Sequence, residues 1–107
     1  MEEIIIFSEE FHQSIEDLVE ILFVKNFFGF EEDCQNYGDR IYDFVINNIV
    51  LPNSKISPEN FQKYGRKYLR YDAKNQTSWY IFFHQKDHRF LVNHILNNHS
   101  QEFPELL

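Results

Sequence analysis

The chain has 107 residues, a length typical of one domain. Its hydrophobic share of 43% and charged share of 25% match those of soluble globular proteins, which excludes intrinsic disorder and fibrous repeats. The longest apolar run, Ile4–Phe7, is too short to cross a membrane and follows acids rather than bases, unlike a secretory signal. Cys34 is the only cysteine, which excludes an internal disulfide and a multi-cysteine zinc site. We therefore expect one cytoplasmic domain over residues 1–107, with no membrane partner.

The net charge of −7 conceals two segments of opposite sign. Residues 1–60 hold three basic and thirteen acidic residues, whereas residues 61–100 hold seven basic and two acidic residues. Four of the five histidines also lie in the second segment. Two interpretations stay open: a mixed solvated surface, or an acidic scaffold that carries a basic working surface.

The N-terminal half predicts a strand followed by two helices. Ile4–Phe7 is apolar throughout and rich in β-branched residues, which is typical of a strand buried on both faces. Ser8 is a suitable N-cap, and apolar residues then recur every three or four positions until Gly29. A second helical pattern runs from about Glu31 to Val50, and the proline-containing segment 52–59 predicts a loop.

The C-terminal half has the two-residue period of strands. From Tyr64 onward Arg66, Tyr68, Arg70 and Asp72 fall on one face, and Trp79–Phe83 is apolar enough to be a central strand. In the last strand, from Phe90 to Leu96, regular alternation places one set of residues toward the helices, namely Phe90, Val92 and Leu96. It places the other set on the opposite face, namely Leu91, Asn93, Ile95, Asn97 and His99.

The predicted fold class is α+β, with an N-terminal strand, a helical hairpin and a three-stranded antiparallel meander. We expect the hairpin to pack on one face of the meander. The residues predicted to form this core are Phe11, Leu18, Leu22, Ile41, Val45, Leu69 and Val92.

The order of these elements and three sequence blocks resemble the RelE/ParE superfamily of toxins from bacterial type II toxin-antitoxin systems. The blocks are Lys67–Arg70, Trp79–His84 and Arg89–His99, and the resemblance covers nearly the whole chain. Members of that family usually carry a basic residue leading into the central strand. Here Trp79 or Tyr80 holds that position, which counts against a nuclease, whereas the basic second segment and His99 count for one.

The resemblance implies a metal-independent, ribosome-dependent mRNA endoribonuclease that needs no cofactor and is held inactive by a cognate antitoxin. The alternative is a non-enzymatic ParE-like inhibitor of DNA gyrase, or a binding protein of the toxin fold whose catalytic residues have decayed. In the nuclease, a ribose 2′-hydroxyl attacks the adjacent phosphate, so the site must move protons and stabilise an extra negative charge.

Three residues are the catalytic candidates that the resemblance implies. Arg70 would stabilise the developing charge and His99 would move a proton. The ordinary alternatives are that Arg70 is a solvated arginine of a strand and that His99 is an exposed histidine at a strand end with no functional role. Tyr80 would donate a proton or stack on a base, or simply pack in the core. The candidate RNA-binding residues are Lys63, Arg66, Lys67, Arg89 and Asn97. A metal site formed by the histidines is not expected, because strand alternation separates them and no carboxylate pattern accompanies them.

Overall fold

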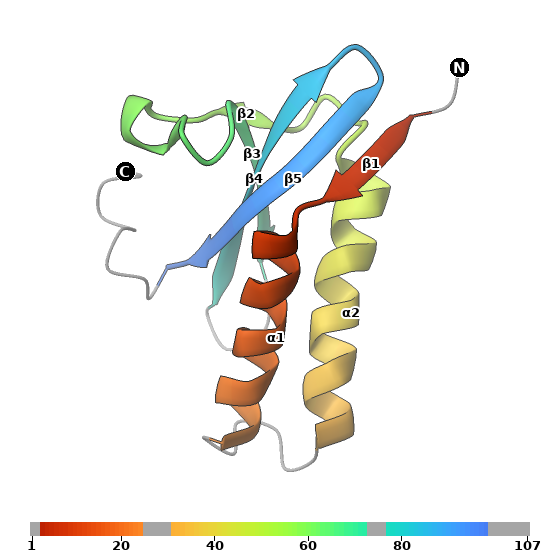
Figure 1. The fold of residues 1–107 in the computed structure, drawn as a ribbon, viewed down its shortest axis with the longest axis vertical. Coiled ribbons are helices and arrows are strands. Elements are labelled where there is room, and N and C mark those ends of the chain that lie inside the picture. Colours follow the sequence, from red (N-terminus) through yellow and green to blue (C-terminus); the bar gives the residue numbers. More distant parts are fainter. Residues whose placement is uncertain (1–2, 25–30, 73–76, 99–107) are drawn as a thin grey trace.

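The computed structural model describes residues 3–24, 31–72 and 77–98, and within them the fold is α+β with two helices and a five-stranded mixed sheet (Figure 1). The sheet has the order β1-β5-β4-β3-β2, so β4 is the central strand, as predicted. The elements in chain order are β1 (Ile4–Phe7), α1 (Glu9–Val24), α2 (Glu31–Asn48), β2 (Lys55–Ile56), a 3-10 turn (Glu59–Phe61), β3 (Lys67–Asp72), β4 (Ser78–Lys86) and β5 (Arg89–Asn97).

The junction between β1 and α1 is fixed by Ser8. The Phe11 amide donates to the Ser8 hydroxyl over 3.0 Å, which caps the helix as the sequence predicts. The Ser8 amide donates in turn to the carbonyl of Val92 in β5 over 2.9 Å. One residue thus ends β1, begins α1 and ties both to the sheet.

The expected three-stranded antiparallel meander is wrong in its strand number, because β1 and β2 extend it at either side. β2 pairs antiparallel with β3, and β1 pairs parallel with β5. The expectation that β1 is buried on both faces is also wrong, because Ile4 and Ile6 are each 51% exposed. The helices cover only one face of the sheet, and β1 lies at its edge.

The main core lies between the helices and that covered face. Of the predicted core residues, Phe11, Ile41, Val45, Leu69 and Val92 are fully or almost fully buried, which confirms the assigned helix and strand faces. Leu18 and Leu22 belong to α1, but their side chains are outside what the structure describes. The ring of Phe44 in α2 stacks on Tyr71 in β3 at 4.7 Å between centroids, so the second helix is held by aromatic contact as well as aliphatic burial.

A second, smaller apolar cluster lies on the opposite face of the sheet, beneath the segment that joins β2 to β3. Phe61 stacks on Phe82 at 5.5 Å, and Tyr64 stacks on His94 at 3.8 Å between ring centroids. The Asn93 side-chain amide donates to the Tyr64 carbonyl over 3.0 Å. The segment between β2 and β3 therefore covers part of the face that the helices leave open. The prediction of a loop over 52–59 is wrong at Lys55–Ile56, which forms β2.

A β-bulge in β5 overturns the predicted alternation of the last strand. Phe83 pairs with Val92 while its neighbour Phe82 pairs with His94, so Asn93 is an extra residue. Because one extra residue inverts every later side chain, Ile95 turns toward the helices and Leu96 joins the second cluster, the reverse of the expectation. Asn97, aligned with Trp79, is inverted as well.

Neither helix of the described residues is long and apolar enough to span a membrane.

Candidate functional site

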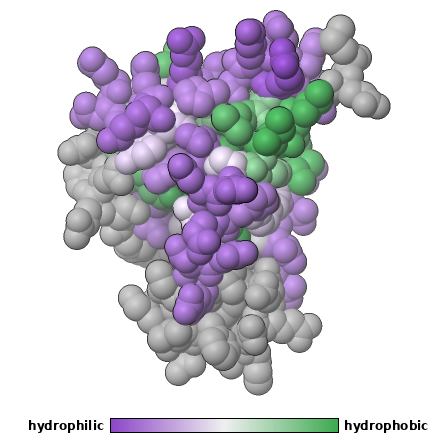
Figure 2. All heavy atoms as spheres, viewed as in Figure 1, coloured by the Kyte–Doolittle hydropathy of each residue, from purple (hydrophilic) through white to green (hydrophobic). Residues whose placement is uncertain are grey.

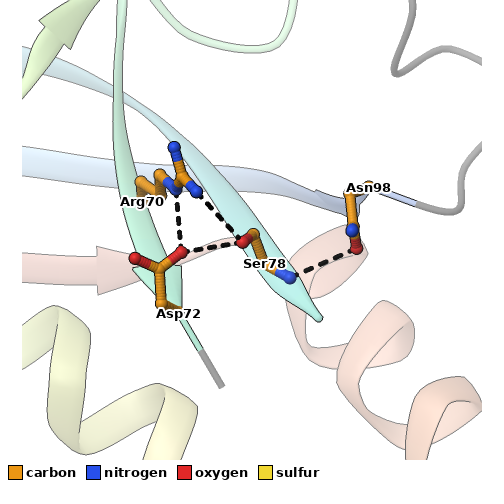
Figure 3. A network of polar contacts seen from close by, with 4 residues as sticks. All are labelled: Arg70, Asp72, Ser78 and Asn98. Atoms are coloured by element: carbon orange, nitrogen blue, oxygen red, sulfur yellow. Dashed lines mark hydrogen bonds and ion pairs between the residues drawn. The ribbon is translucent and has the colours of Figure 1, made fainter. Parts of the chain in front are cut away.

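A polar network occupies the end of the sheet where β3 stops and β4 begins (Figure 3). The Arg70 Nε donates to the Asp72 Oδ1 over 2.8 Å, and the Ser78 hydroxyl donates to the same oxygen over 2.7 Å. The Arg70 Nη2 lies 3.5 Å from the Ser78 hydroxyl oxygen. Backbone register explains the cluster, because Asp72 and Ser78 face each other across the two strands.

The last residue of the network ties it to β5. The Ser78 amide donates to the Asn98 side-chain oxygen over 3.2 Å, and the Asn98 amide donates to the Ser78 carbonyl over 3.1 Å. Ser78 is therefore held by its backbone on one side while its hydroxyl bonds Asp72 on the other. The three side chains Arg70, Asp72 and Ser78 share one face of the sheet, away from the helices.

Hydrogen bonding favours the charged forms of both ionisable groups in this network. The hydroxyl of Ser78, followed by the guanidinium of Arg70, lowers the pKa of Asp72, so its carboxylate stays ionised. The hydrogen bond to Asp72 raises the pKa of Arg70. Both side chains remain accessible, at 54% and 67% exposure. A guanidinium has five N–H donors, so Arg70 keeps donors for an oxyanion such as a phosphate while Asp72 orients it.

Tyr80 lies directly opposite Arg70 in the register of β3 and β4, so these two predicted catalytic residues are neighbours. The Tyr80 ring is only 6% exposed and packs in the second cluster, with the Tyr68 ring at 6.0 Å. Burial of this kind favours packing over stacking on a base. The third candidate, His99, lies outside the described residues.

The predicted RNA-binding residues are spread over several parts of the molecule. The Lys67 Nζ donates to Gln85 over 3.4 Å and Lys67 pairs with the core residue Phe83, so Lys67 lies on the opposite face from Arg70. Arg89 begins β5 opposite Lys86, which lies six residues along β4 from Tyr80, a separation of about 20 Å. Neither of them can join Arg70 on a single phosphate.

The remaining three candidates are also dispersed. Lys63 lies over the Tyr64 ring with its Nζ 5.0 Å from the centroid, and Arg66 is exposed just before β3. The Arg66 carbonyl accepts the Ser57 amide over 2.8 Å, which fixes the backbone there. Asn97 is aligned with Trp79 on the helix side of the sheet. The structure therefore does not gather the five predicted RNA-binding residues around Arg70.

Sequence reasoning missed the partners of Arg70. Asp72 falls two positions after Arg70 and so shares its face, which is the signal that would have suggested an ion pair. Ser78 and Asn98 become neighbours only through the registers of β4 with β3 and β5. Among the described residues, no three metal-ligating side chains come together. Comparisons of the chain with protein-family models, with curated proteins and with solved structures find no match.

Proposed function

We propose that this chain is a toxin of a type II toxin-antitoxin pair that cleaves mRNA on the ribosome without a metal ion. The observation that carries the proposal is the exposed Arg70, oriented by Asp72 and Ser78 on a sheet face away from the helices. The basic character of residues 61–100 supports it, because RNA binding depends on neutralising phosphates. A cognate antitoxin would be the partner that keeps the toxin inactive.

In the proposed reaction, the 2′-hydroxyl oxygen attacks the adjacent phosphorus and the 5′ oxygen leaves. Arg70 contacts the phosphate and offsets the charge that grows on its oxygens. Asp72 holds the guanidinium in place but is a poor proton acceptor, because its pKa is lowered. Two protons must move, one from the 2′-hydroxyl and one to the leaving 5′ oxygen. His99 is the candidate for proton transfer, as the family resemblance implies, and the Tyr80 hydroxyl is the second candidate, as donor to the 5′ oxygen.

One observation favours the non-enzymatic alternative, a gyrase inhibitor or a decayed toxin-fold binder. Asp72 lies against Arg70 and so offsets much of the positive charge that a phosphate would meet. A protein-binding surface tolerates such a pair more easily than a site that must stabilise a dianionic phosphorane. The two functions therefore predict different consequences for the loss of Arg70.

Induction of the chain in a bacterial host, with transcripts mapped by primer extension, tests the proposal. The nuclease predicts codon-phased cuts and growth arrest, and Arg70→Ala should lower the cleavage rate by about 10² to 10³-fold. Arg70→Lys keeps the charge but loses the planar donor fork, so it should restore activity only in part. Arg40→Ala, which removes an exposed arginine from α2, is the matched control and should leave the cuts unchanged.

Three outcomes would contradict the nuclease. Replication arrest without cuts would assign the gyrase alternative, and the absence of any phenotype would assign a decayed binder. Cleavage that survives Arg70→Ala together with His99→Gln would show that another surface performs the chemistry. Purified variants should elute and melt like the parent protein, because Arg70 is exposed and its loss opens no cavity.

A further inference from the structure

A second exposed surface lies on the face of the sheet away from the helices, where β1, β5 and β4 run side by side next to the β4–β5 hairpin. Strand register arranges side chains there in two rows, each crossing the three strands. The first row is Ile4, Arg89 and Lys86, and the second row is Ile6, Leu91 and His84. We call these residues the hairpin face.

Alternation along the strands places the whole hairpin face on the side opposite the main core. In β5, Phe90 and Val92 are buried in that core, so Leu91 between them is directed away from it. Phe83 in β4 is buried in the main core, and Ile5 in β1 packs against it. Their neighbours in the hairpin face are therefore directed to the open side of the sheet.

The apolar half of the hairpin face is exposed and hollowed. Ile4 and Ile6 are each 51% exposed and Leu91 is 39% exposed, although all three are large and apolar. A shallow hollow of about 290 Å³ opens here, and its lining includes Ile6, Leu91 and Arg89. Figure 2 shows a continuous apolar area over β1 bordered by hydrophilic residues. An exposed aliphatic group of this kind is typical of a contact surface.

The basic half contains two like charges that face each other. Lys86 and Arg89 are directly opposite in the hairpin, an arrangement that destabilises an antiparallel pair. Asp87 follows Lys86 in the turn, but among the described residues neither cation forms an ion pair. A carboxylate from another molecule would remove this repulsion, so the hairpin face gains more from an acidic ligand than from a neutral one.

The dimensions of the hairpin face fit a helix that lies on the sheet along the strands. The two rows are about 6.8 Å apart, since they are two residues apart in each strand, and residues four apart in a helix are separated by about 6 Å. The axes of β1 and β4 are two strand spacings, or about 10 Å, apart, which is the diameter of a helix with its side chains. One helix can therefore contact all three strands at once.

We infer that the hairpin face binds an amphipathic helix of another protein, in which acidic residues run along one side of the apolar stripe. The stripe lies on Ile4, Ile6 and Leu91, and the acidic side chains lie over Lys86 and Arg89. A second copy of this chain fits less well, because the described apolar side chains of α1 and α2 are largely buried in the main core. The inference is independent of the proposed nuclease, since Arg70 lies at the other end of β3 and β4.

Two capped peptides of about 16 residues test the charge argument, because this length permits a helix in water. Both carry the same leucine stripe, which is flanked by glutamates in one and by lysines in the other. The glutamate peptide should bind at least about tenfold more tightly at low salt, and its affinity should fall as salt rises. Lys86→Glu with Arg89→Glu should transfer the preference to the lysine peptide. Arg40→Glu with Lys55→Glu makes the same change in net charge at exposed positions elsewhere and should not transfer it.

A second pair of variants tests the apolar contact. Ile6→Asn should weaken binding of the glutamate peptide by about tenfold, because a half-exposed isoleucine then no longer buries its surface. Ile56→Asn is the control, since Ile56 is 78% exposed in β2 at the opposite edge of the sheet, and it should leave the affinity unchanged. The methyl NMR resonances of Ile4, Ile6 and Leu91 should shift on binding.

Several results would overturn the inference. Equal binding of the two peptides would remove the charge argument. Slowed amide exchange at Ile5 and Phe7, without the methyl shifts, would show a strand added at the edge of β1 instead of a helix on the sheet. A dimer in sedimentation equilibrium that Ile6→Asn dissociates would assign the hairpin face to self-association. An RNA oligonucleotide that binds through Lys86 and Arg89, while neither peptide binds, would assign it to nucleic acid. Loss of peptide binding in Arg70→Ala would contradict the separation of the two sites.

Discussion

Replacement of Gly65 by alanine would force a methyl group into the backbone of the central strand. A Cβ at Gly65 would lie 2.4 Å from the Phe83 nitrogen and 2.8 Å from the Phe82 carbonyl carbon, far inside ordinary contact. Backbone atoms of a central strand cannot rotate away as a side chain can, so the segment that carries Gly65 must move by about 1 Å. At Gly65, therefore, a single added methyl group would displace the segment between β2 and β3.

The cost follows from what that movement would break. The Asn93–Tyr64 hydrogen bond of 3.0 Å, the Ser57–Arg66 hydrogen bond of 2.8 Å and the Tyr64–His94 stack all depend on the position of the segment. Hydrogen bonds contribute about 0.5–1.5 kcal/mol each and an aromatic pair about as much, so we expect a loss of about 2–4 kcal/mol.

Urea unfolding followed by circular dichroism measures this loss, with the midpoint and slope compared between the parent and Gly65→Ala. Near-ultraviolet dichroism should change as well, because the displaced rings pack against Phe82. A loss below about 0.5 kcal/mol would refute the close approach of Gly65 to β4, since surface changes fall in that range.

The remaining predictions concern other elements of the fold. Ile41→Ala should lower the free energy of unfolding by about 2–5 kcal/mol, because the side chain is fully buried, and thermal melts would check it. Ser57→Ala should leave stability unchanged or raise it by about 1 kcal/mol in urea titrations, because the buried hydroxyl has no partner among the described residues. Asp72 has a lowered pKa, so its contacts stabilise the fold fully above the ordinary carboxyl pKa of about 3.9 and this contribution is lost as the pH falls through the folded-state pKa. Asp72→Asn should therefore reduce the decrease in the free energy of unfolding at acid pH, which urea unfolding at several pH values would measure. Asp87 has a φ of 55°, so Asp87→Val should cost about 1–2 kcal/mol in thermal melts while Asp87→Gly is tolerated.

The local chemistry of the chain predicted the secondary structure well. The apolar period of α1 and α2, the cap at Ser8 and the strand β1 at Ile4–Phe7 agree with the structure. These features depend on neighbours a few residues apart, and such contacts can be read directly from spacing. For the same reason the face of β3 that carries Arg70 was predicted correctly.

The candidate site was only partly predictable. Arg70 and Asp72 are two positions apart, so their shared face follows from the period of a strand. Ser78 joins them through the pairing of β3 with β4, and Arg89 leaves the candidate group through the pairing of β4 with β5. Lys67 is excluded by the strand period itself, because it lies three positions before Arg70. Strand pairing depends on contacts between distant residues, which the spacing of one sequence does not report.

By itself, the sequence determined the α+β class, the helical faces and the basic C-terminal segment, because composition and short periods set these locally. The tertiary structure decided the five-strand order, the parallel pairing of β1 with β5 and the bulge at Asn93. That bulge reverses the face to which the side chains after Asn93 point. Regular alternation does not predict it, because an extra residue can be recognised only from the pairing with the neighbouring strand. Helix cover on one face alone then leaves Ile4 and Ile6 exposed at the edge, where spacing predicted a buried strand.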